Sequence, residues 1–179
     1  MNRNRQIKKC ELKECMRVVW LQHVYWTRML LISIAERLAD QADVTARLLR
    51  NPADIACIFA KFFSCHVSEV EQLLTEHLQI GAELITALRD GSSNAAELDK
   101  SWYINAEQMA KALHCMNQCY DFCEIRAMLF THLDLTKKEV AARLAKKYKE
   151  DIAAFAAVEK EAINMADMLT CGIADCCNL

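Results

Sequence analysis

Apolar residues recur at alternating steps of three and four along most of the chain, a spacing that places them on one face of an α-helix. The pattern predicts an all-α fold, a four-helix-type bundle with additional short helices. The long helices are expected over residues 11–38, from Ser68 to about Gly91, from the turn GSSNAAELD through Met116, and from Thr136 to about Gly172. Short helices are expected on either side of RNPAD and before the last long helix.

Local signals predict where these helices begin. Asn51 is the expected N-cap before Pro52, and Asp121 is the expected cap of a short helix that ends at about His132. Two pairs have the spacing of a capping box, in which a hydroxyl and a carboxylate satisfy the first free amides of a helix. These pairs are Ser68 with Glu71 and Thr136 with Glu139.

The composition supports this fold class. The chain of 179 residues contains three glycines and one proline, which suits long helices joined by few tight turns. Its length is that of one domain whose core can sustain the fold without disulfide bonds or structural metals. We expect a basic N-terminal tail over residues 1–10, a single helical-bundle domain over 11–172 and a cysteine-rich tail over 173–179.

Charge and hydropathy argue against nucleic-acid and membrane partners. The formal net charge of −2 gives no general attraction to polyanions. The most apolar stretch, VVWLQHVYWTRMLLISIA, is interrupted by Gln22, His23 and Arg28, so it predicts a core helix rather than a membrane span. Since no secretory sequence opens the chain, we expect a cytoplasmic protein with reduced cysteines. The sequence also allows self-association as a homo-oligomer.

Polar residues interrupt the apolar faces at a few positions. Each of the first two long helices carries one histidine in its apolar line, and the last long helix carries one carboxylate. The expected inward-facing residues are Met16, Trp20, His23, Thr27, Leu30 and Ile34; Val70, Leu73, His77, Ile80, Leu84 and Ala87; and Leu144, Tyr148, Asp151, Phe155, Val158, Ala162, Met165 and Leu169. His132 lies on the apolar face of the short helix before the last one.

These positions indicate a polar site in the middle of the bundle. Antiparallel packing can bring His23, His77 and Asp151 into one layer, and His132 joins them only if its helix folds back. Neutral imidazoles with an anionic oxygen suit a divalent ion such as zinc, iron or manganese, or a small ligand. The alternative is a hydrogen-bonded core without metal, in which Asp151 pairs with a histidine or with Arg28.

The stretch ALHCMNQCYDFCE raises a second hypothesis, a thiol-rich soft-metal or redox protein. Cys115, Cys119 and Cys123 are four residues apart, so one continuous helix would align three thiols, beside Met116, for Cu(I) or zinc. The expected cap at Asp121 divides the stretch between two helices and favours thiols that act as small hydrophobic or surface residues. A third hypothesis is a structural or partner-binding helical module without catalysis.

Two segments resemble metal-binding helical bundles of the hemerythrin, DinB and ferritin-like kind. They are QHVYWTR, followed by an apolar helix, and LLTEHLQIGAELI with its Glu-His pair. The resemblance implies an all-helical metal protein in which His23 and His77 are ligands, with Glu76 and His132 as further candidates.

The whole chain is also similar to short bacterial proteins that automated labelling describes as acetylglutamate kinase. The shared pieces are HVYWTR, RLLRNPAD, LLTEHL and THLDLT. An amino-acid kinase holds phosphates with the backbone amides of glycine-rich loops, and three scattered glycines cannot build such loops. The sequence also lacks a nucleophile elbow and a dinucleotide fingerprint, so we expect no kinase activity and predict no particular reaction.

Overall fold

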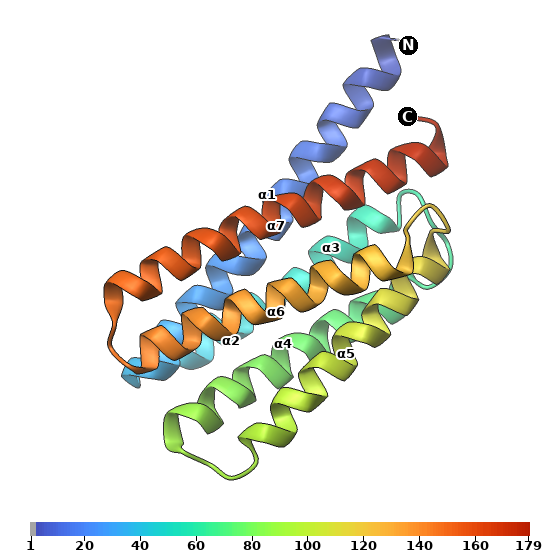
Figure 1. The fold of residues 1–179 in the computed structure, drawn as a ribbon. Coiled ribbons are helices and arrows are strands. Elements are labelled where there is room, and N and C mark those ends of the chain that lie inside the picture. The colour runs from blue at the N-terminus through green and yellow to red at the C-terminus, as the bar shows by residue number, and fades with distance from the viewer. Residues whose placement is uncertain (1–2) are drawn as a thin grey trace.

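The computed structural model describes residues 3–179, which form seven α-helices and no strand (Figure 1). The helices are α1 (Arg3–Glu36), α2 (Gln41–Leu48), α3 (Asn51–Phe59), α4 (Val67–Asp90), α5 (Ala95–Met116), α6 (Phe122–Leu144) and α7 (Tyr148–Cys177). The prediction of an all-α bundle is confirmed. No helix within residues 3–179 has both the length and the apolar character needed to span a membrane.

The five long helices pack in a closed order. α1 lies against α7, α7 against α6, α6 against α5, α5 against α4, and α4 returns to α1, while α3 fills the space between α1 and α4. The short α2 packs against α1, and the two ends of the chain lie at the same end of the molecule (Figure 1). Segments far apart in the sequence therefore meet in the middle of the bundle.

The prediction of a helix start at Thr136 is wrong. α6 runs without a break from Phe122 to Leu144, because the Thr136 hydroxyl donates to the carbonyl of His132 and the Glu139 carboxylate accepts from Arg28 instead of capping a helix. The chain turns back at residues 145–147, where Lys146 has a positive φ of 58°. The expected last helix is therefore two antiparallel helices, and the bundle has five long helices rather than four.

The other helix starts were predicted with mixed success. The Asp121 carboxylate accepts a hydrogen bond from the amide of Glu124, as expected of an N-cap. α4 begins at Val67 after a left-handed His66 and has no side-chain cap, so Ser68 with Glu71 is not a capping box. α1 begins at Arg3 rather than residue 11 and ends at Glu36.

Two hydrophobic clusters fill the bundle. The larger includes Met16, Trp20, Ile55, Phe59, Val70, Met109, Leu113, Ile125 and Leu169. The smaller consists of Leu30, Leu31, Ile34, Leu48, Leu78, Ile85 and Val140. Most of the inward-facing residues predicted on α1 and α4 are buried, including both histidines, whereas Tyr148 at the start of α7 is 45% exposed.

Candidate functional site

Three histidines from three helices gather around one small cavity between the two hydrophobic clusters. His23 of α1, His77 of α4 and His132 of α6 are at most 5% exposed, and all three line a cavity of about 20 Å³. The rings of His23 and His132 have centres 5.9 Å apart. This volume holds about one water-sized species. The turn at residues 145–147 folds α7 back along α6, and α6 itself places His132 beside His23.

An asparagine fixes the orientation of His23. The Asn51 side-chain amide donates through Nδ2 to the carbonyl of Val19 at 2.8 Å, which leaves Oδ1 facing the imidazole. His23 Nδ1 lies 3.0 Å from that oxygen. Because Oδ1 only accepts, Nδ1 carries the proton and Nε2 keeps an unprotonated lone pair for the cavity. Asn51, expected as a helix cap, is in fact fully buried in this contact.

The same arrangement occurs a second time at His77. Its Nδ1 lies 3.0 Å from Asn105 Oδ1, and Asn105 Nδ2 donates to the carbonyl of Leu73 at 3.1 Å. In both copies the asparagine follows the histidine by 28 residues, and the accepting carbonyl lies one helical turn before the histidine. The sequence analysis missed both asparagines, although their equal spacing from the two histidines was visible in the sequence.

The backbone carbonyl of each histidine is also satisfied. Thr27 Oγ1 donates to the carbonyl of His23 at 2.8 Å, and Thr136 Oγ1 donates to that of His132 at 2.9 Å. At His77 the donor is instead the indole of Trp102, at 3.0 Å.

A glycine makes room for that indole. The residue one turn after His77 is Gly81, where an added Cβ would lie 3.2 Å from the Trp102 ring. Glycine at this position lets Trp102 stack on His77 with ring centres 5.2 Å apart.

The three imidazoles are neutral near pH 7. Burial lowers the pKa of His23 to about 4, although its bond to Asn51 opposes the shift. Burial and the neighbouring His23 lower the pKa of His77 to about 3, and burial with both other imidazoles lowers the pKa of His132 well below its usual value. His132 differs in one respect, since its buried Nδ1 has no hydrogen-bond partner among the described residues.

Asp151 lies away from the histidines, in a buried ion-pair network. Arg28 reaches both of its carboxylate oxygens, at 2.8 and 3.2 Å, and Arg143 lies 3.5 Å away. Arg28 also bonds Glu139 at 2.5 Å. Burial and the charge of Asp151 raise the pKa of Glu139 to about 7, against the opposing effect of Arg28. The pairing of Asp151 with Arg28 is the metal-free alternative raised by the sequence.

The remaining candidate residues are at the surface. Glu76 accepts a hydrogen bond from Gln72 there. Cys115 ends up on α5, Cys119 in the turn and Cys123 on α6, all three exposed, so they are not aligned on one helix.

The described residues contain no ready-made metal cluster. Within residues 3–179, no group of three or more His, Cys, Asp or Glu side chains is placed so that it could hold a metal ion without rearrangement. Comparison with known families, curated proteins and solved structures gives no match. Any function must therefore be argued from the geometry of the histidine cavity.

Proposed function

We propose that the chain binds one divalent metal ion, zinc, iron or manganese, through Nε2 of His23, His77 and His132. The observation that supports this most is the repeated histidine–asparagine–carbonyl arrangement, which fixes the tautomer of two buried imidazoles. Metal-binding histidines characteristically donate their other ring N–H to a side-chain or backbone oxygen, which orients the ring and raises its basicity. In a metal-free core the same bonds would only satisfy the two buried N–H groups.

The donor set fits a borderline divalent ion. Three neutral imidazole nitrogens are ligands that zinc and iron accept readily. Both Nδ1 atoms of His23 and His77 are engaged by asparagines, so the lone pair of each Nε2 is left for a ligand. An ion held between the rings would use both lone pairs at once.

The rings of His23 and His132 lie near the separation that two ligands of one ion have. Two imidazoles on one zinc ion, each at an N–Zn distance of ~2.1 Å, have ring centres roughly 5 Å apart, compared with 5.9 Å between His23 and His132. His132 is the ring that is free to adjust, because its Nδ1 is not held. Since Asp151 is engaged by arginines, one coordination position is left for an exogenous ligand, as in catalytic rather than structural zinc sites.

The likeness to known metal-binding bundles and the cellular compartment are also proposals. A bundle with a histidine site would resemble the hemerythrin, DinB and ferritin-like proteins in general plan. The ten cysteines are all free thiols, which suits the reducing cytoplasm.

Metal analysis of protein purified under reducing conditions tests the proposal. We expect about one zinc, iron or manganese ion per chain, lost in His77→Ala and retained in His66→Asn. His66 is an exposed histidine in a left-handed conformation that asparagine tolerates. Several Cu(I) ions, lost when Cys115, Cys119 and Cys123 are replaced, would favour the thiol hypothesis. If no preparation contains metal, the remaining hypothesis is a structural or partner-binding helical module.

A further inference from the structure

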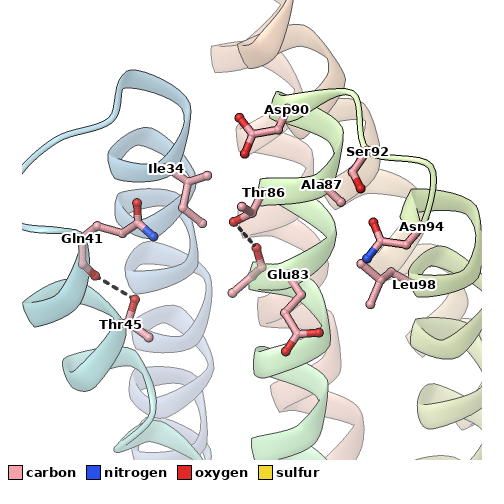
Figure 2. Close-up of a pocket in the computed structure, with 11 residues that line it drawn as sticks. Ile34, Gln41, Thr45, Glu83, Thr86, Ala87, Asp90, Ser92, Asn94 and Leu98 are labelled. Atoms are coloured by element: carbon pink, nitrogen blue, oxygen red, sulfur yellow. Dashed lines mark hydrogen bonds between the residues drawn. The ribbon is translucent and has the colours of Figure 1, made fainter.

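An open groove lies next to the histidine cavity. It has a volume of about 610 Å³ and runs between α2 and α4 toward the α4–α5 turn (Figure 2). Its apolar lining residues are Ile34, Ala82, Ala87 and Leu98, and its polar lining residues are Gln41, Thr45, Glu83, Thr86, Asp90, Ser92 and Asn94. A groove of this size and mixed lining is typical of small-molecule sites.

One residue lines both the groove and the cavity. Ala82 of α4 is part of each wall, so the open groove and the more enclosed space beside the histidines meet at this residue. The same three helices continue on both sides. Leu30 and Leu48 line the cavity, whereas Ile34 and Thr45, about one turn away on α1 and α2, line the groove.

The helix on the far side of the groove is the least tightly held. α2 has only eight residues and packs mainly against α1 rather than α4. Gln41 and Thr45 of α2 face Thr86 of α4 across the groove (Figure 2). A short helix with one main neighbour can shift at less cost than the long helices of the core.

We propose that the groove between α2 and α4 is the route by which an exogenous ligand reaches the open position beside His23, His77 and His132, with Ala82 as the gate. The inference rests on the proposed metal site and adds its access path and ligand class. The cavity admits about one water-sized group. The ligand is therefore water, a narrow anion, or a small organic molecule whose apolar body lies in the groove and whose narrow head group passes Ala82.

The charge of the groove is compatible with such a molecule. Asp90 is already neutralised, since its carboxylate bonds both Arg37 and Arg89. The other polar groups of the rim are neutral hydroxyls and amides, except for the exposed Glu83. The two arginines balance Asp90 and Glu83, so the lining favours a neutral body.

Azide binding to the cobalt-substituted protein tests the route. Co²⁺ replaces zinc in such sites and gives a visible spectrum that changes when azide, a narrow three-atom anion, adds to the ion. In Ala82→Phe we expect the association rate of azide to fall about tenfold or more, because the gate must open for each event. The Co²⁺ stoichiometry and the visible spectrum before azide is added should match those of the wild type.

Two further variants complete the test. Ala153→Phe makes the same substitution at an exposed position of α7 that lines neither the groove nor the cavity, and should leave the rate unchanged. Ala82→Gly should keep or raise the rate, and it decides the matter if Ala82→Phe does not fold. Cobalt-loaded Ala82→Phe that binds azide at the wild-type rate, or Ala82→Gly that binds it more slowly, overturns the route alone. A wild type that takes up no Co²⁺ overturns the metal site and the route together.

Discussion

His23 and Asn51 hold each other in the core through an imidazole N–H that can only donate to the asparagine oxygen, at 3.0 Å. The contact determines which nitrogen of His23 carries the proton, because the asparagine amide is itself anchored to the carbonyl of Val19. The tautomer of a buried histidine is thereby set by a residue that does not line the cavity.

Asn51→Ala should weaken zinc binding without removing a ligand. Loss of such an orienting partner typically lowers metal affinity by about 10–100-fold, and the buried bonds that are lost should destabilise the fold by about 1–3 kcal/mol. Competition with a chromophoric chelator measures the first effect and urea unfolding the second. Asn94→Ala, at an exposed position in the α4–α5 turn, should change neither. Unchanged zinc affinity in Asn51→Ala would contradict the positioning role.

Acid should destabilise the metal-free protein as the pH falls below about 6.5. Histidines with lowered pKa values are neutral when folded but take up protons when unfolded, so the free energy of unfolding falls with falling pH until the folded pKa values of about 4 and 3 are reached. Each histidine contributes a slope of about 1.4 kcal/mol per pH unit.

Glu139 has the opposite effect on how the free energy of unfolding depends on pH. Its folded pKa is raised to about 7, so its contribution to stability is lost as the pH rises from its unfolded value through 7. Urea unfolding at a series of pH values should give a net positive slope that becomes smaller in His23→Gln. An equal slope in that variant would show that His23 is not buried in its neutral form.

Asp151→Asn should destabilise the fold strongly. It leaves two arginines with only Glu139 as a buried counter-ion, and breaking a buried ion pair typically costs about 3–5 kcal/mol. The matched control is Glu150→Gln in the preceding residue, where an exposed pair with Lys147 at 3.2 Å is worth about 0–1 kcal/mol. Chemical unfolding of the two variants side by side checks the difference, and similar losses would argue against a buried network.

The two buried glycines should respond unequally to alanine. An added Cβ at Gly172 would lie 2.1 Å from the Tyr120 ring, whereas at Gly81 the nearest atom of Trp102 is 3.2 Å away. Overpacking of this kind costs about 1–3 kcal/mol, set against about 1 kcal/mol gained from helix propensity. Gly172→Ala should therefore lower the melting temperature clearly more than Gly81→Ala, as circular dichroism would show.

Joint replacement of Cys115, Cys119 and Cys123 by serine should leave the fold intact. All three residues are exposed, and surface substitutions usually change stability by less than about 0.5 kcal/mol each. Thermal unfolding followed by circular dichroism measures the loss, and a large drop in melting temperature would show that the thiols are structural.

Helical periodicity was enough to predict the buried faces of α1 and α4 and the histidines on them. It failed where a polar side chain had two plausible local roles. Asn51 before a proline and Thr136 followed by Glu139 both fit helix-cap patterns, yet their hydrogen bonds go to partners on other helices or into the helix itself. Local sequence contains no information about those partners, so the second half of α6 was assigned to the next helix.

The position of His132 depended on the same difficulty. The chain reverses at Lys146 without glycine or proline, so no turn signal showed that His132 and Asp151 lie on two antiparallel helices. The preference of Asp151 for Arg28 over the histidines likewise follows from charge, since a buried carboxylate is stabilised more by a guanidinium than by a neutral imidazole.

The three imidazoles lie at residues 23, 77 and 132, spread over most of the chain. The layer of three imidazoles is therefore complete only after α6 has docked on α1. An ion bound there, as proposed, would load only once the chain has folded that far, and not while α1 to α5 are being made.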